Sequence, residues 1–131
     1  MPLHRGSCHC GLVKFKIQSE ITELTTCDCS ICIKKNAVMT KIHESAFELL
    51  SDWDDVSEYN WNTKTARHFF CKKCGVYTFH RKRAQPDHFG INIYCLDDFD
   101  ASTVQIRPTS GKNMSIKAGD ARHEWLGPRV R

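Results

Sequence analysis

Hydrophobic and polar residues alternate over several short stretches of this chain. Val13, Phe15 and Ile17 are separated by Lys14 and Lys16, and a period of two is typical of a strand with one buried face. Many short strands at spacings near ten residues favour a mostly antiparallel β architecture. Strands are predicted at residues 11–17, 23–29, 37–42, 58–61, 66–70, 76–80 and 90–95.

Turn-forming residues separate these strands, and helix signals are weak. Turns are indicated at Asn62, Pro86-Asp87, Gly90 and Asp97-Asp98. Residues 45–50 fit one or two helical turns, with Ser45 as the N-cap and Glu48 three residues later.

Length and hydropathy limit the classes of protein that this chain can represent. Its 131 residues are the size of one domain, so we expect a single domain over residues 1–131, with an uncertain tail from about residue 116. The longest apolar runs are only a few residues, too short to span a membrane. No apolar stretch of signal-peptide length follows Met1, so we expect a cytoplasmic protein with reduced thiols.

Seven of the eight cysteines fall into three tight groups. A disulfide framework is the alternative explanation, but such close spacings and the missing secretory signal favour metal chelation. Zinc held for structure takes four protein ligands, whereas zinc held for chemistry takes three and keeps one position open. The groups are Cys8-His9-Cys10, Cys27-Asp28-Cys29-Ser30-Ile31-Cys32 and Cys71-Lys72-Lys73-Cys74.

The first and third groups can complete one closed site. Cys71 and Cys74 have the spacing of a zinc knuckle, and Gly75 allows the positive φ that such a turn often needs. Cys8 and Cys10 need two further ligands, so the two pairs can satisfy each other. His9, between two liganding cysteines, is interpreted as a spacer that points away from the metal.

The middle group offers three sulfurs, from Cys27, Cys29 and Cys32. Spacing alone leaves two alternatives open. In one, water or a substrate sulfur takes the fourth position, which favours catalysis or binding. In the other, Cys95 or a histidine closes the site, although a lone cysteine in an apolar strand is more often a small buried side chain.

The remaining polar residues carry weaker signals. Lys34 and Lys35 follow Cys32 directly, so they are candidate substrate-binding residues that place a cation near an anionic ligand. The run His80-Arg81-Lys82-Arg83 is interpreted as a solvated hairpin end or, alternatively, as an edge that binds carboxylate or phosphate. The scattered histidines are expected at the surface, and Trp53, Tyr59 and Trp61 in the core or at its rim.

Net charge argues against a general affinity for nucleic acid. The formal charge is +4 with neutral thiols. Seven thiolates would subtract seven charges and two Zn²⁺ ions would add four, which leaves +1. A nearly neutral protein has no strong general attraction for phosphate backbones. Sulfur donors favour zinc, although iron accepts the same ligands.

Four motifs in this order resemble the glutathione-dependent formaldehyde-activating enzyme (Gfa)/centromere protein V family over about residues 4–115. They are CxC at 8–10, CxCSxC at 27–32, FCxxCG at 70–75 and NxxCLD at 92–97. Residues 59–63, 66–76 and 89–91 are most similar to the centromere protein V branch. Ile33 stands where family members often carry arginine.

The resemblance implies an Mss4-like fold, mostly β, in which two zinc ions hold short antiparallel sheets together. It assigns a structural zinc to Cys8, Cys10, Cys71 and Cys74, and a catalytic zinc to Cys27, Cys29 and Cys32. The family reaction joins glutathione and formaldehyde into S-(hydroxymethyl)glutathione, formally a carbon–sulfur lyase reaction run backwards.

The expected partner is therefore a small-molecule thiol such as glutathione, and the oligomeric state is not indicated. Two other functions remain open from the sequence. One is a non-catalytic zinc protein that binds thiol adducts, and the other is a zinc-ribbon-like interaction module.

Overall fold

Ten strands in two sheets account for most of the regular structure in the part of the chain described by the computed structural model, residues 2–60, 66–83 and 85–109. Trp61, Asn62 and the predicted tail lie outside this part. One short α-helix and four 3₁₀ turns complete the described elements. The predicted mostly β fold is confirmed.

The smaller sheet contains β1 (Leu3–Ser7), β2 (Lys14–Gln18) and β5 (Phe47–Leu49), in the order β1-β2-β5 with antiparallel pairing. The alternation predicted for β2 is confirmed, because Phe15 and Ile17 are fully buried and Lys14 is exposed. Each buried side chain faces the larger sheet, so this small sheet closes one side of the core.

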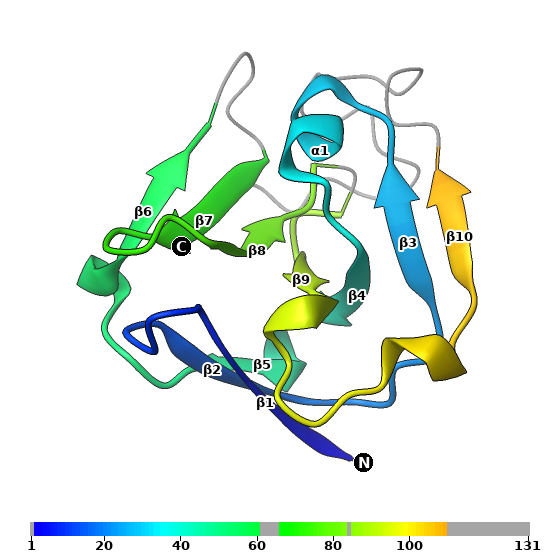
Figure 1. The fold of residues 1–131 in the computed structure, drawn as a ribbon, viewed down its shortest axis with the longest axis horizontal. Helices are drawn as coiled ribbons and strands as arrows, with labels where there is room; N and C mark the ends of the chain where they lie inside the picture. Colours follow the sequence, from blue (N-terminus) through cyan, green and yellow to red (C-terminus); the bar gives the residue numbers. More distant parts are fainter. Residues whose placement is uncertain (1, 61–65, 84, 110–131) are drawn as a thin grey trace.

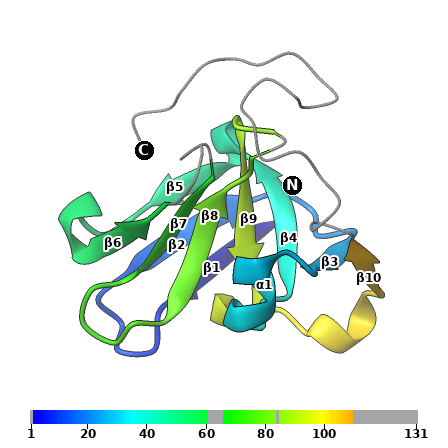
Figure 2. The same ribbon diagram turned by 90° about the horizontal axis from the view of Figure 1, so that it is seen from above.

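The larger sheet has the strand order β10-β3-β4-β9-β8-β7-β6. Neighbours are antiparallel, except that β10 pairs with β3 in parallel. In Figure 1 it curves from β10 on the right to β6 on the left, and Figure 2 shows β1 and β2 behind it. The strands are β3 (Leu24–Cys27), β4 (Met39–His43), β6 (Val56–Tyr59), β7 (Arg67–Cys71), β8 (Tyr77–Arg81), β9 (His88–Asn92) and β10 (Ile106–Thr109).

An aromatic core lies between the two sheets. The ring of Phe79 packs 5.7 Å from that of Phe15 and 5.3 Å from that of Phe69, measured between ring centroids. Phe47, Phe89 and Trp53 surround the same ring. These contacts join residues that are distant in the sequence, and they place the loops between strands at the edges, where the cysteines lie.

The structure corrects the prediction of a helix at residues 45–50. Residues Glu44–Ala46 form one 3₁₀ turn (η1), and β5 follows at once. His43, not Ser45, caps the turn, since the Ser45 amide donates to His43 Nδ1 at 3.1 Å. Packing of Phe47 on the aromatic core favours a strand over continued helix.

The other short elements were not predicted. An α-helix, α1 (Ser30–Lys35), lies within the middle cysteine group. The predicted strand at 90–95 ends early, and Ile93–Cys95 form a 3₁₀ turn (η3) because the Asn92 side chain accepts from the Tyr94 amide. Two further 3₁₀ turns are η2 (Trp53–Asp55) and η4 (Ala101–Thr103).

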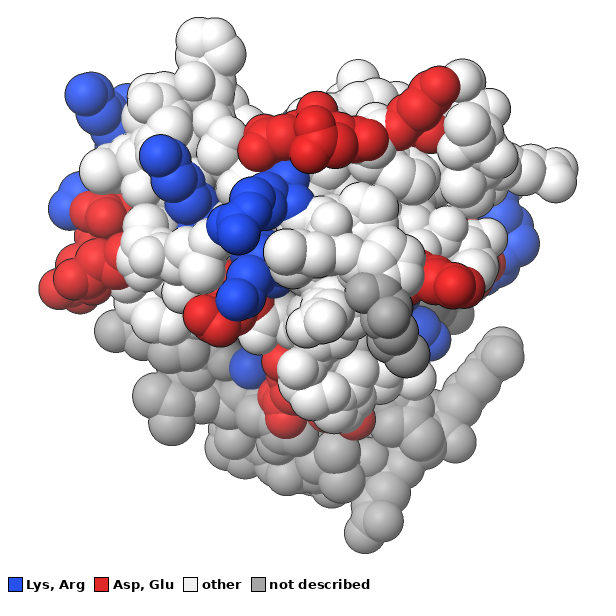
Figure 3. All heavy atoms as spheres, turned by 90° about the horizontal axis from the view of Figure 1, so that it is seen from below, with Lys and Arg blue, Asp and Glu red and all other residues white. Residues whose placement is uncertain are grey.

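Charged side chains are dispersed over the surface. On the face shown in Figure 3, acidic and basic residues lie in small separate groups among uncharged ones. No helix among the described residues is long and apolar enough to cross a membrane.

Candidate metal centres

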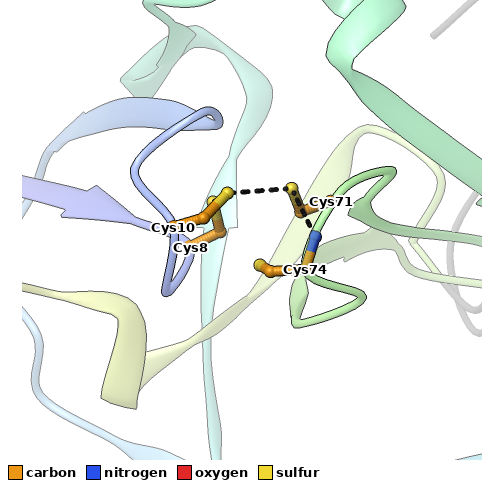
Figure 4. Close-up of side chains that lie close together, drawn as sticks. All are labelled: Cys8, Cys10, Cys71 and Cys74. Carbon is orange, nitrogen blue, oxygen red and sulfur yellow. Dashed lines mark hydrogen bonds between the residues drawn. The ribbon is translucent and has the colours of Figure 1, made fainter.

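Four cysteine sulfurs converge where the two sheets meet. The Sγ atoms of Cys8, Cys10, Cys71 and Cys74 all lie within 4.8 Å of one another. Cys8 and Cys10 come from the loop between β1 and β2, whereas Cys71 ends β7 and Cys74 lies in the turn that leads to β8 (Figure 4). The pairing expected from the sequence is therefore present, between residues 61 positions apart.

Both pairs of cysteines are held by the same kind of turn. The Cys8 amide donates to the Val13 carbonyl at 3.0 Å, and the Cys71 amide donates to the Val76 carbonyl at 3.1 Å. A glycine after the second cysteine takes positive φ in each turn, +84° at Gly11 and +77° at Gly75. The sequence pattern of two cysteines and a glycine thus produces two knuckles that face each other.

The spacing and environment of these sulfurs fit a zinc ion. Cys10 Sγ lies 3.6 Å from both Cys8 Sγ and Cys71 Sγ, and tetrahedral zinc with bonds of about 2.3 Å separates its sulfurs by about 3.8 Å. Amides also point at the sulfurs, since Val13 N lies 3.3 Å from Cys8 Sγ and Cys74 N lies 3.4 Å from Cys71 Sγ. Such N–H donors stabilise thiolates, the form that binds metal.

Other backbone groups favour the ionised form of Cys74. Backbone hydrogen bonds from Cys10 and Val76 lower the pKa of Cys74 to about 6, against the opposing effect of burial. A thiol of this kind is already ionised near neutral pH, which favours metal binding.

A second cluster contains the sulfurs of Cys27, Cys29 and Cys32, again within 4.8 Å of one another. Cys27 ends β3, Cys29 is the N-cap of α1, and Cys32 lies inside that helix. The Cys32 amide donates to Cys29 Sγ at 3.4 Å. The chain therefore turns around one site between the end of β3 and the first turn of α1, and the three sulfurs face that site.

The three thiols share protons unequally. Hydrogen bonds from Cys29 and Cys32 lower the pKa of Cys27, whereas the bonds with Cys27 and Cys29 raise the pKa of Cys32. One sulfur ionises first because the other two donate to it. This donor set is also one that suits zinc.

Among the described residues, no fourth cysteine, histidine or carboxylate joins this cluster. Cys95, the alternative fourth ligand, donates instead to the Tyr77 carbonyl at 3.6 Å and packs in the core between the sheets. Cys32 belongs to a separate small apolar cluster with Ala37 and Met39. His9 is exposed and is absent from both sulfur clusters.

The two candidate substrate-binding lysines differ in position. Helix α1 ends at Asn36, which adopts the left-handed conformation with φ 52° and ψ 43°. Lys34 is exposed, whereas Lys35 is half-buried on the same helical face as Cys32. The Lys35 ammonium donates to His68 Nδ1 at 3.0 Å and lies 3.7 Å from the centroid of the Tyr77 ring.

Sequence reasoning missed a buried polar group beside this lysine. His68 and His80 are cross-strand partners in β7 and β8, and their rings stack with centroids 5.2 Å apart. The Tyr77 hydroxyl lies 2.5 Å from His80 Nδ1 and donates to the Gly90 carbonyl at 3.2 Å. The available signal was the position of both histidines, each next to phenylalanine in a strand with buried aromatic residues.

These histidines are held neutral. Burial, followed by the charge of Lys35, lowers the pKa of His68 to about 3. Burial also keeps the pKa of His80 well below its usual value, with further contributions from Lys35, Lys82 and His68. Both rings therefore act as hydrogen-bonding groups without charge at neutral pH.

The basic run at residues 80–83 is not a solvated hairpin end throughout. His80 and Arg81 are buried. Arg81 donates to Glu44 Oε1 at 2.7 Å, and its guanidinium lies 3.9 Å from the centroid of the Phe89 ring. Arg81 therefore stabilises the core.

Comparison with known proteins decides the family. The model of the family described as glutathione-dependent formaldehyde-activating enzyme matches residues 3–115. The chain belongs to this family. A crystal structure of a Rhodobacter sphaeroides protein is similar to it, with a TM-score of 0.75 and 29% sequence identity. That similarity covers 80% of this chain and 99% of the other.

Family membership confirms the resemblance inferred from the four cysteine motifs and agrees with an Mss4-like fold. The described residues contain two cysteine clusters, of four and three sulfurs, that could each hold a metal ion. In this member of the family, the closed and the three-sulfur clusters are built by different elements and have different surroundings.

Proposed function

We propose that this chain is a zinc-dependent carbon–sulfur lyase that forms or cleaves the adduct between a thiol and a small electrophile. Glutathione and formaldehyde are the first candidates because the family description names both. The observation that carries the proposal is the cluster of Cys27, Cys29 and Cys32, which has three sulfurs and no fourth protein ligand among the described residues.

The two clusters would have separate roles. Cys8, Cys10, Cys71 and Cys74 would hold a structural zinc with a complete ligand set. Cys27, Cys29 and Cys32 would hold the catalytic zinc, and an ion bound there would accept a thiol as fourth ligand and keep it as thiolate. The cysteines fix where that sulfur lies, so positioning supplies much of the effect.

Electrostatics beside the cluster also support this role. Three thiolates carry one more negative charge than Zn²⁺ neutralises. Burial lowers the pKa of Lys35 to about 8, and the thiols of Cys32 and Cys29 oppose this shift. Lys35 is therefore still mostly a cation near neutral pH and offsets part of this negative charge. Lys34, the other candidate from the sequence, is exposed on the same helix and has no assigned role in the site.

The test is the rate at which glutathione and formaldehyde exchange with S-(hydroxymethyl)glutathione, followed by NMR with and without the zinc-loaded protein. We expect acceleration above the spontaneous rate and two zinc ions per chain. Cys29→Ala should retain one zinc, bind glutathione weakly and give only the spontaneous rate. Cys95→Ser is the matched control and should keep both zinc ions and the full rate.

Two outcomes would contradict the proposal. Binding of glutathione without any acceleration would indicate a carrier or sensor of thiol adducts. Unchanged glutathione affinity in Cys29→Ala would show that the three-cysteine cluster is not where the thiol binds.

A further inference from the structure

The Lys35 ammonium lies at the end of the helix that carries the three-cysteine cluster. Among the described residues, Lys35 forms no ion pair with an acidic side chain, and its ammonium contacts a ring nitrogen of His68 and the face of Tyr77. Tyr77 packs against the small cluster that contains Cys32 and that Cys27 and Cys29 also contact. The Tyr77 ring thus contacts both the Lys35 ammonium and the small cluster that contains Cys32.

A half-buried cation is costly unless negative charge compensates it. Burial lowers the pKa of Lys35 to about 8, and the thiols of Cys32, Cys29 and Cys27 act in the opposite direction by favouring its charged form. The anionic partner of this lysine is thus the sulfur cluster itself, together with anything anionic that binds there.

The surrounding residues hold the ammonium in one place. His68 accepts one N–H, and its ring is stacked on that of His80. The Tyr77 ring, which lies under the ammonium, is fixed by the contacts of its hydroxyl with His80 and the Gly90 carbonyl. A Cβ at Gly90 would lie 2.3 Å from His80 Cε1, so this packing allows only glycine.

No acceptor within residues 2–60, 66–83 and 85–109 contacts the third N–H of the ammonium. An ammonium has three donors, of which one faces His68 and another faces the Tyr77 ring. A fixed donor beside a thiolate is the arrangement that stabilises an oxygen on which negative charge develops.

We propose that Lys35 contacts the electrophile and donates this hydrogen bond to its carbonyl oxygen, which makes Lys35 a catalytic residue of the reaction. The inference rests on the proposed function. It differs from carboxylate binding, which would involve the thiol substrate before any electrophile is present.

The step balances without a further reagent. The thiol loses its proton to solvent when it binds, and the thiolate sulfur then forms a bond to the carbonyl carbon. The electron pair of the C=O π bond moves to oxygen, where the Lys35 hydrogen bond stabilises it. Solvent supplies the proton that completes the hydroxymethyl group, and cleavage follows the same path in reverse.

The experiment compares Lys35→Met with Lys34→Met, a matched removal of charge from the exposed neighbour on the same helix. Both variants should retain two zinc ions and bind glutathione within about twofold of the unmodified protein. Lys35→Met should lower kcat by about 10²-fold, the usual effect of losing one such donor. Lys34→Met should leave kcat unchanged.

A binding measurement tests the contact without turnover. 2-Mercaptoethanol and 1-propanethiol have the same number of heavy atoms. The first carries a hydroxyl group where the second carries a methyl group, so only the first can accept a hydrogen bond from Lys35. Calorimetry on the zinc-loaded protein should give a preference of several-fold for 2-mercaptoethanol, which Lys35→Met abolishes and Lys34→Met keeps. If the protein does not accelerate the reaction but this preference depends on Lys35, the proposed function fails while the contact stands.

The inference is overturned if Lys35→Met matches Lys34→Met in both kcat and thiol preference. It is also overturned if Lys35→Met weakens glutathione itself and leaves the thiol preference intact, because the lysine then binds a carboxylate. Should Lys35→Met lose zinc or unfold, His68→Phe replaces it. This variant keeps a ring in the stack but removes the acceptor that positions the ammonium, and an unchanged thiol preference in it would overturn the inference.

Discussion

Two glycines near the cysteine clusters are required for different physical reasons. Gly75 takes positive φ, and a Cβ there would meet no atom within 4 Å. Gly90 has ordinary φ, but a Cβ there would collide with the ring of His80. Gly75 is thus required by its positive φ, whereas Gly90 is required because no side chain fits beside the His80 ring.

Gly75→Ala should therefore destabilise the protein only through its backbone conformation, by about 1 kcal/mol. Asparagine tolerates positive φ better than alanine, so Gly75→Asn should recover most of this loss. Urea unfolding of the zinc-loaded variants measures both. Equal stability of the two variants would show that conformational strain is not what selects glycine.

At the scale of elements, strands β7 and β8 carry a pair of neutral histidines into the interior. His68 and His80 are each 5% exposed. His68 accepts a hydrogen bond from Lys35, and His80 contacts the Tyr77 hydroxyl. A histidine buried without charge must take up a proton when the protein unfolds at acid pH.

This arrangement predicts a stability that falls on acidification. The pKa of His68 is lowered from the usual 6.5 to about 3, so its contribution is fully present above about pH 6.5. It is lost progressively as the pH falls toward 3, at up to about 1.4 kcal/mol per pH unit. His68→Phe should have a shallower dependence than the unmodified protein between pH 7 and 5.

Chemical unfolding at several pH values measures this slope. Any loss of zinc at low pH affects both proteins, so their difference isolates the histidine. His9→Gln, which changes an exposed side chain, is the control and should keep the original slope. A His68→Phe slope as steep as that of the control would contradict the assignment of a buried neutral histidine.

At the scale of the whole molecule, the four-cysteine cluster joins the two sheets. Its ligands come in pairs from the β1–β2 loop and from the β7–β8 turn, which lie next to each other in Figure 1. The three-cysteine cluster, by contrast, is built from one continuous segment around α1. Loss of metal should therefore have unequal consequences at the two clusters.

Cys10→Ser should destabilise the entire fold, since structural zinc contributes on the order of 10 kcal/mol to folding. Cys29→Ser should remove one zinc ion but retain a cooperative thermal transition. Circular dichroism melting with zinc analysis checks both variants. The distinction fails if Cys10→Ser melts at the same temperature as Cys29→Ser.

The sequence by itself determined the features that depend on residues close together in the chain, namely the strands and the sets of cysteine ligands. Alternation of side chains marked the strand around Phe15, short strands between turn residues were predicted around Phe69 and Phe79, and cysteine spacing marked the two sets of sulfurs. Cysteines that are close in sequence can bind one ion only if the chain turns between them. The spacing between cysteines therefore predicts which of them belong to the same ligand set. The helix at Ser30–Lys35 escaped detection because it is only six residues long, and its start is set by a cysteine cap.

The tertiary structure decided what depends on contacts between distant segments. It paired β10 with β3 in parallel, excluded Cys95 from the three-cysteine cluster, and turned Lys35 inward while Lys34 remained exposed. It also buried His68 and His80 against each other across two strands. No local pattern encodes these outcomes, because burial of a polar side chain is stabilised by partners that only the folded sheet brings beside it.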